Sequence, residues 1–242
     1  MDISNTQKID ETIYLNENRY EKPKESFKQV AGLLKLDEVK PSKSLLDLGC
    51  ATGEFLYYIR QINQSIELHG IEYSNNMVNS CKDLLLKHQI KINCGDVRQL
   101  TDIKDSSFDY VTMFGLFGVT SVFDDFRPIF NEMIRVAKND GTCVNHMLVN
   151  ELDIDIIFKY RKPGTDIEGF GNKFSIQSIQ KFLEQHPHVN GFRFIKHEMP
   201  FDIKKTDDLM RTWTEQIDGK RILWNGLNME VSLYNVVFEI KK

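Results

Sequence analysis

Residues 45–55 of the chain read LLDLGCATGEF, an apolar run that ends in a turn of small residues and continues into a helical pattern. A turn of this kind lets a ligand approach the backbone closely. A dinucleotide motif G-x-G-x-x-G is disfavoured because its third glycine is replaced by Glu54, whose carboxylate would repel a pyrophosphate. A phosphate loop is disfavoured because no Gly-Lys-Ser/Thr follows. The turn therefore favours a ligand that carries a positive charge, with Asp47 as a hydrogen-bond acceptor.

Strand-like and helix-like segments alternate on both sides of this turn through the first 150 residues, which indicates a parallel sheet. Apolar patterning predicts strands at 45–49, 66–72, 90–94, 108–114, 142–149, 192–195 and 231–240. Helices are expected over 27–34, 53–61 and 126–137 and after the capping residues Ser74 and Ser175. A turn is expected at 139–141, a loop or cap at 151–173, and a hairpin at 213–224 around Asp218-Gly219. We predict an α/β, Rossmann-like fold: a seven-stranded, mostly parallel sheet with one antiparallel edge strand and helices on both faces.

The composition disfavours several classes of protein. The 242 residues carry 31 Lys plus Arg against 35 Asp plus Glu, and this mild acidity disfavours a dedicated nucleic-acid binder, so no nucleic-acid partner is expected. The N-terminus is polar and no apolar run reaches 18 residues, so we expect a cytoplasmic protein without a membrane partner. The four cysteines lack the spacing of metal ligands, and we expect reduced thiols and no metal.

Residues 47–53, DLGCATG, resemble the first motif of class I S-adenosylmethionine-dependent methyltransferases, in which Asp/Glu-x-Gly-x-Gly-x-Gly is usual and Ala51 replaces the middle glycine. Three further segments fall in that family's order, at Glu72, at 93–97 and at 108–115. The resemblance covers residues 27–150 well and 151–242 only loosely. It implies S-adenosylmethionine as cofactor and S-adenosylhomocysteine as product.

The resemblance also implies a role for each segment. Glu72 would grip both ribose hydroxyls, Asp96 would accept from the adenine amino group, and Val97 would pack on the adenine ring. The cofactor-binding residues expected in this way are Tyr14, Tyr20, Asp47, Gly49, Cys50, Ala51, Gly53, Glu72, Tyr73, Asp96, Val97, Met113, Phe114 and Gly115. Each assignment has a structural alternative: a turn or helix cap for Asp47 and Asp96, a solvated strand end for Glu72, and sheet-edge cover for Tyr73.

Two further features bear on catalysis. Tyr14, Arg19 and Tyr20 lie in the N-terminal segment that folds over the cofactor in related enzymes, although a surface helix is an equal alternative. His146 is the only histidine that the expected topology places near the carboxyl edge of the sheet, and it is the candidate general base, with a core histidine as the alternative. The remaining histidines look solvated: His69, His88, His186, His188 and His197.

We expect a single methyltransferase domain over residues 1–242, with N-terminal lid helices at 1–42 and a cofactor-binding core at 43–150. An acceptor-side cap and hairpin would follow at 151–230, and a final strand at 231–242. Lysines and arginines alternate with aromatic residues in the cap, which favours either an anionic acceptor or a solvated surface. Residues 218–226 resemble methyltransferases found with sugar, capsule and surface-polysaccharide biosynthesis.

The predicted function is methyl transfer to a small polar acceptor, an oxygen of a sugar, nucleotide-linked sugar or phosphorylated metabolite. A tRNA or protein methyltransferase is the first alternative. The Asn/Asp-Pro-Pro-Tyr/Phe signature of enzymes that methylate exocyclic base nitrogens is absent. A Rossmann-type NAD-dependent oxidoreductase or epimerase is the second alternative, and a cofactor-binding protein without catalysis is the third.

Overall fold

The computed structural model describes residues 15, 19–116, 125–161, 163–164, 168–207, 211–225, 227 and 229–242, with the backbone alone at 168–170. The expected position of Tyr14 lies outside these residues. No described helix is long and apolar enough to cross a membrane.

The central sheet has the strand order β3-β2-β1-β4-β5-β11-β8. Its strands are β1 (Ser44–Leu48), β2 (Glu67–Glu72), β3 (Ile90–Cys94), β4 (Phe108–Phe114), β5 (Ala137–Asn150), β8 (Val189–Lys196) and β11 (Ser232–Ile240). The first five are parallel, whereas β11 runs antiparallel to both β5 and β8. The predicted Rossmann-like sheet is confirmed, and the reversed strand lies one position in from the edge strand β8.

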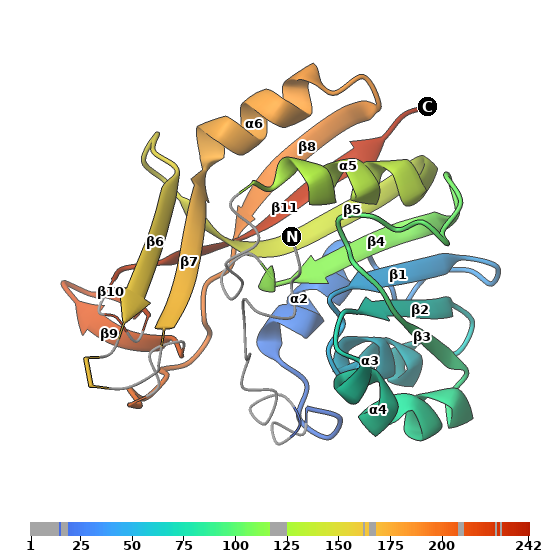
Figure 1. Cartoon of the computed structure of the whole chain (residues 1–242), viewed down its shortest axis with the longest axis horizontal. Coiled ribbons are helices and arrows are strands. Elements are labelled where there is room, and N and C mark those ends of the chain that lie inside the picture. Colours follow the sequence, from blue (N-terminus) through green and yellow to red (C-terminus); the bar gives the residue numbers. More distant parts are fainter. Residues whose placement is uncertain are drawn as a thin grey trace.

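Helices cover both faces of this sheet (Figure 1). On one face, α2 (Glu25–Leu33), α3 (Glu54–Ile62) and α4 (Asn75–Lys87) pack through apolar residues such as Phe27, Phe55 and Leu85. On the other face, α5 (Arg127–Val136) and α6 (Ile176–Gln185) bury side chains such as Phe130 and Leu183. The two cores hold the strands in a fixed layer, so the strand ends form a rigid platform for a site.

Helix starts follow the capping rules that the sequence predicts. The Ser74 Oγ accepts from the Met77 N–H, and the Ser175 Oγ accepts from the Ser178 N–H, so each hydroxyl satisfies a free donor in the first helical turn. The hairpin of β9 (Trp213–Ile217) and β10 (Lys220–Trp224) is also confirmed. Its turn residues Asp218 and Gly219 have φ angles of 49° and 76°, as a tight two-residue turn requires.

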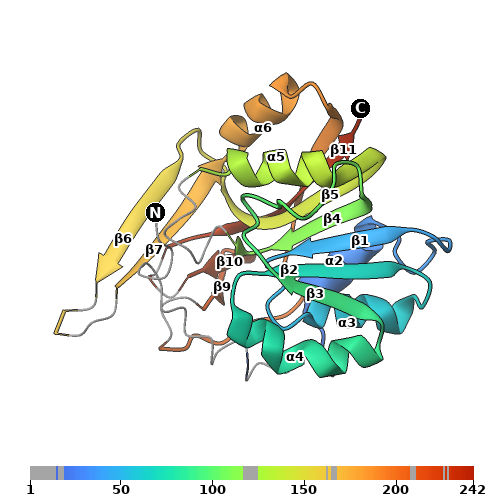
Figure 2. The same cartoon turned by 45° about the vertical axis from the view of Figure 1, so that its right-hand side comes forward.

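The expectation of a loop over 151–173 is wrong. This segment contains β6 (Ile156–Arg161), which pairs antiparallel with β7 (Glu168–Ser175). Gly171, whose neighbourhood favoured a loop in the sequence, lies inside β7 opposite Phe158 of β6. The ring of Phe158 packs over Gly171 and occupies the space that a Cβ would need, so this strand position requires glycine. Figure 2 shows this hairpin extending away from the helices of the domain.

The expected turn at 139–141 is likewise part of a strand. Helix α5 leads into β5 at Ala137, and the pairing of β5 with β4 shifts between Phe108 and Tyr110. Asp140 adopts a φ of 60° there, and Gly141 lies close to backbone atoms of Lys138 and Asp109. The turn-forming residues produce an irregularity within β5 rather than its start.

Buried Arg60 joins α3 to the segments that precede β2 and β3. Its guanidinium donates to four backbone carbonyls, those of Gln64, Ile66, His88 and Gln89. Arg60→Ala should lower the free energy of unfolding by about 2–4 kcal/mol, because it removes one buried and three part-buried hydrogen bonds to backbone carbonyls. Urea denaturation would measure this, with Arg193→Ala as control, since Arg193 makes an exposed ion pair with Glu239. Equal effects of the two substitutions would contradict this role.

Candidate functional site

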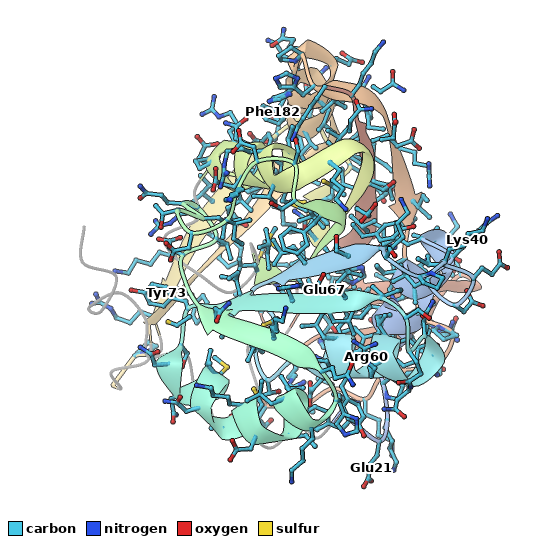
Figure 3. The ribbon with its side chains drawn as sticks, turned by 90° about the vertical axis from the view of Figure 1, so that its right-hand side faces the viewer. Glu21, Lys40, Arg60, Glu67, Tyr73 and Phe182 are labelled. Atoms are coloured by element: carbon cyan, nitrogen blue, oxygen red, sulfur yellow. The ribbon has the colours of Figure 1, made fainter. Side chains whose placement is uncertain are left out.

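The carboxyl ends of β1, β2, β3 and β4 meet at one edge of the sheet because these strands are parallel. Figure 3 shows Tyr73, which follows β2, at this edge and Lys40, which precedes β1, at the opposite one. Ligands of open α/β sheets bind at the carboxyl edge. The structure therefore brings the motif residues predicted from the sequence to one place.

The turn after β1 has an open, left-handed backbone. Gly49, Ala51 and Gly53 have φ angles of 66°, 48° and 75°. The N–H groups of Gly49 and Cys50 both donate to the Ile71 carbonyl, at 2.8 and 3.1 Å, which ties the turn to β2. A Cβ at Gly53 would lie 2.5 Å from the side chain of Leu85, so α4 approaches the turn too closely for a larger residue.

Glu72 connects this turn to the end of β2. One carboxylate oxygen accepts from the Ala51 N–H at 2.9 Å, and the other accepts from the Ser74 N–H at 2.9 Å. The residue is only 7% exposed. Glu72 therefore ties the turn after β1 to the segment that follows β2.

Asp47 is the most perturbed acid of the site. Its carboxylate is buried and accepts from the Thr112 hydroxyl at 2.7 Å, which ties β1 to β4. Burial raises the pKa of Asp47 to about 8, opposed by the Thr112 hydrogen bond and reinforced by the charge of Glu72. A cation beside Asp47 would favour its ionised form and lower this pKa again.

The N-terminal segment packs directly on the turn. The Arg19 N–H donates to a carboxylate oxygen of Glu54 at 2.7 Å, and the Tyr20 hydroxyl donates to the Thr52 carbonyl. The Tyr20 ring also contacts Tyr57 edge to face. The hydroxyl of Thr52 is buried and has no hydrogen-bond partner in the described part of the chain. Arg19 and Tyr20 therefore contact the turn after β1 and the start of α3.

The expected adenine-binding residues differ in accessibility. The Asp96 carboxylate pairs with the Arg98 guanidinium at 2.6 Å, and hydrogen bonds from Arg98 hold the Asp96 pKa below its usual range against the opposing effect of burial. Tyr73 is 51% exposed and offers a ring face beside Glu72. Val97 is buried in the apolar core instead. Its contact with an adenine ring stays a prediction.

The end of β4 lies beside β5 and the α2 face of the sheet. Met113 is fully buried, whereas Phe114 packs against the rings of Phe27 and Phe55 on the α2 face. Gly115 has a φ of 66°, and its N–H donates to the carbonyl of His146 at 2.8 Å. His146 on β5 is therefore level with the carboxyl end of β4.

His146 is buried among polar partners. Its Nδ1 lies 2.9 Å from the Asn235 Oδ1, and burial lowers its pKa to about 4, partly opposed by this hydrogen bond. The His197 ring lies 5.0 Å away in a T-shaped contact, and His197 is itself only 7% exposed. The expectation that His197 is solvated is wrong, because α2 covers it and its Nδ1 lies against the Gln29 side-chain oxygen.

Four side chains near this edge carry no sequence signal of their own: Gln29, Lys173, His197 and Asn235. They come from α2, β7, the end of β8 and β11, which are far apart in the chain. No local spacing relates them, so only the folded sheet could reveal them.

Comparison with known families gives one match. The family model described as a methyltransferase domain matches residues 46–145. These residues contain the turn after β1, Glu72, Asp96 and the end of β4. No curated protein sequence matches the chain.

Solved structures with the same fold extend over most of the chain at low identity. A protein of Bacillus subtilis is 16% identical with a TM-score of 0.56, covering 89% of this chain and 99% of its own. An S-adenosylmethionine-dependent methyltransferase of Methanosarcina mazei is 13% identical with a TM-score of 0.58, covering 86% and 97%. Phosphoethanolamine N-methyltransferase 2 of Haemonchus contortus, solved with phosphomonomethylethanolamine and S-adenosylhomocysteine, is 14% identical with a TM-score of 0.52, covering 70% of this chain and 38% of its own.

The domain match and the fold agree with the expectation from the motifs. Residues 46–145 match the methyltransferase domain family, and most of the chain has the fold of S-adenosylmethionine-dependent methyltransferases of known structure. The site could hold S-adenosylmethionine, because it has a left-handed turn without bulky side chains, the unpartnered hydroxyl of Thr52, and buried acidic side chains at the ends of β1 and β2.

Proposed function

We propose that the chain methylates a small polar acceptor, at an oxygen of a sugar, a nucleotide-linked sugar or a phosphorylated metabolite. The observation that carries this proposal is the position of His146, a buried and neutral imidazole level with the end of β4. When bound, S-adenosylmethionine supplies a methyl group on a positively charged sulfur. His146 removes the acceptor proton, and the surrounding layers exclude water.

The cofactor residues are part of the proposal. Glu72 would hold the ribose hydroxyls, Asp47 and the turn at 49–53 would bind the amino acid part, and Tyr73 would lie on the adenine. Asp96 and Val97 would complete the adenine site, and residues 113–115 would flank the methionine part. Tyr14 and Tyr20 would cover the cofactor. The support is that the described members of this set lie at or beside one edge of the sheet or on the turn.

The proposed domain division places acceptor selection in the less regular parts. Residues 1–42 would form the lid, 43–150 would bind the cofactor, 151–230 would form the acceptor-side cap, and 231–242 would complete the sheet. The β6–β7 and β9–β10 hairpins both fall within the proposed cap. We place the enzyme in the cytoplasm, in the biosynthesis of a sugar or a capsule polysaccharide. The support is the resemblance of residues 218–226 to methyltransferases found with such biosynthesis.

Lys173 supports an anionic group on the acceptor. Strand β5 pairs with β11 along one edge and with β4 along the other. Beyond the end of β4, at Val149, this second edge of β5 pairs with β7. Because strand residues alternate between faces, Lys173 points to the same face as His146. Lys173 is buried as a residue, with 7% of its surface exposed, and its ammonium donates to the Glu230 carbonyl at 2.6 Å, its one hydrogen-bond partner in the described residues. The remaining N–H groups suit a phosphate or a carboxylate.

Lys173→Met should raise the KM for an anionic acceptor by about 10- to 100-fold with little change in S-adenosylhomocysteine affinity, since it removes a charged hydrogen bond. Steady-state kinetics and calorimetry would measure the two quantities. Lys181→Met, on the exposed side of α6, is the matched control. A lower melting temperature with an unchanged KM would contradict the proposed contact.

The proposed acceptor class can be tested without knowing the acceptor. The purified chain is incubated with methyl-labelled S-adenosylmethionine and a cell extract separated into small molecules, RNA and protein. Label in the small-molecule fraction is expected. Label confined to RNA or protein would contradict the proposal and support the tRNA or protein alternative.

A further inference from the structure

Four polar side chains form a continuous hydrogen-bonded chain beneath α2. The His146 Nδ1 meets the Asn235 Oδ1 at 2.9 Å, and the Asn235 Nδ2 donates to the Gln29 Oε1 at 2.7 Å. The His197 Nδ1 meets the same Gln29 oxygen at 2.5 Å. The chain joins β5, β11, α2 and the residue after β8, and it includes residues 206 positions apart.

The direction of these bonds fixes the proton on His146. Because the Asn235 amide nitrogen donates to Gln29, its oxygen faces the imidazole and can only accept. The Nδ1 of His146 must therefore carry the proton, which leaves the lone pair on Nε2. The Gln29 oxygen accepts from both Asn235 and His197, which uses its two lone pairs, so the hydrogen bonds from the two histidines converge on this oxygen.

The surroundings hold His146 neutral. Asn235 is fully buried, and both histidines are 7% exposed. The groups that act on His146 are His197 and Lys24, which disfavour its protonated form, and Phe114 packs beside the ring. Glu25 lies near enough to His197 to favour the charged form of that residue, but burial outweighs it. No carboxylate in the described residues bonds to His146, so an amide does the orienting.

We propose that Asn235 and Gln29 are positioning residues that hold His146 with Nδ1 protonated and Nε2 free to act as the base. This rests on the proposed function, in which the acceptor hydroxyl loses its proton to Nε2 of His146. In that step the acceptor oxygen bonds to the methyl group, and the sulfur keeps the electron pair of the broken bond. The amide chain raises the fraction of His146 in the productive tautomer and fixes the plane of its ring.

The first test reads the tautomer directly. Nitrogen-15 NMR of the histidine side chains in the full chain distinguishes a protonated from an unprotonated Nδ1. The expected spectrum of His146, assigned by its loss in His146→Ala, shows Nδ1 protonated and Nε2 unprotonated near neutral pH. Asn235→Leu should give a mixture of tautomers. A wild-type protein with the proton on Nε2 would overturn the proposal.

The second test uses kinetics with two substitutions at one position. Asn235→Leu keeps the size but removes the acceptor, and it should lower kcat by about 10- to 100-fold with KM and S-adenosylhomocysteine affinity unchanged. Asn235→Asp keeps an acceptor and adds a charge that stabilises the imidazolium. It should retain kcat within about threefold at high pH and move the acid limb of the kcat profile upward.

Gln29→Leu keeps the test decisive if Asn235→Leu does not fold. It should lower kcat by about 3- to 10-fold through the same tautomer change, because Asn235 loses the acceptor that orients it. Full turnover in Asn235→Leu and Gln29→Leu, with His146→Ala inactive, would overturn the positioning role alone. Full turnover in His146→Ala would instead remove the base from the proposed function.

Discussion

Replacing His146 with alanine is expected to lower turnover by about 10²- to 10⁴-fold, the usual contribution of a positioned base. The residue is buried, held through Nδ1 by Asn235, and level with the end of β4. Its pKa of about 4 leaves the imidazole unprotonated above roughly pH 5, so wild-type turnover should not fall with decreasing pH until the solution approaches that value. Affinity for S-adenosylhomocysteine should be unaffected.

The control for this substitution is His188→Ala, at an exposed position after α6. Both variants should bind S-adenosylhomocysteine as the wild type does, and the His188 variant should also keep full turnover. A His146 variant with normal turnover and a lower melting temperature would identify His146 as a core residue. That result would remove the observation on which the proposed acceptor chemistry depends.

Replacing Glu72 with alanine is expected to weaken S-adenosylhomocysteine binding by about 1.5–3 kcal/mol, the range for hydrogen bonds to a charged group. Two consequences combine in this value. The substitution removes the proposed acceptor of the ribose hydroxyls, and the Ala51 N–H loses its bond to the Glu72 carboxylate. Titration calorimetry measures the affinity, and a thermal melt shows whether the fold is retained.

Glu67→Ala is the matched control for Glu72. It removes a glutamate from the opposite end of the same strand, where the carboxylate is exposed and pairs with Lys91 and His69. The control should leave the affinity unchanged. An unchanged affinity in the Glu72 variant as well would remove Glu72 from the cofactor site.

The part of the fold that depends on local sequence was predictable. Strands β3 and β4 match the expected ranges, and Ser74 and Ser175 cap the helices that follow them. The signals are short-range: an apolar run, a capping hydroxyl and a turn of small residues. The turn after β1 was predictable for the same reason, because its glycines and Asp47 are adjacent in the chain.

The parts that depend on contacts between distant segments were not predictable. Gly171 favoured a loop in the sequence, yet it lies in β7 because Phe158 packs across it. His197 follows a strand and looked solvated, yet it is buried against Gln29, 168 positions away. Asn235 and Lys173 had no motif to mark them, since their partners come from other elements. Tertiary packing decides burial at such positions.

The two parts of the proposed site differ in the same way. The proposed cofactor site lies at the ends of strands that follow one another in the sequence, so local motifs mark it. The proposed acceptor site involves α2, β7 and β11, whose side chains come together only in the folded chain.

Titration calorimetry of the full chain with S-adenosylhomocysteine, and separately with NAD, tests the cofactor assignment most directly. Saturable binding of S-adenosylhomocysteine is predicted, with no heat of binding from NAD. Binding of NAD without binding of S-adenosylhomocysteine would contradict the methyltransferase assignment and favour an oxidoreductase on the same fold.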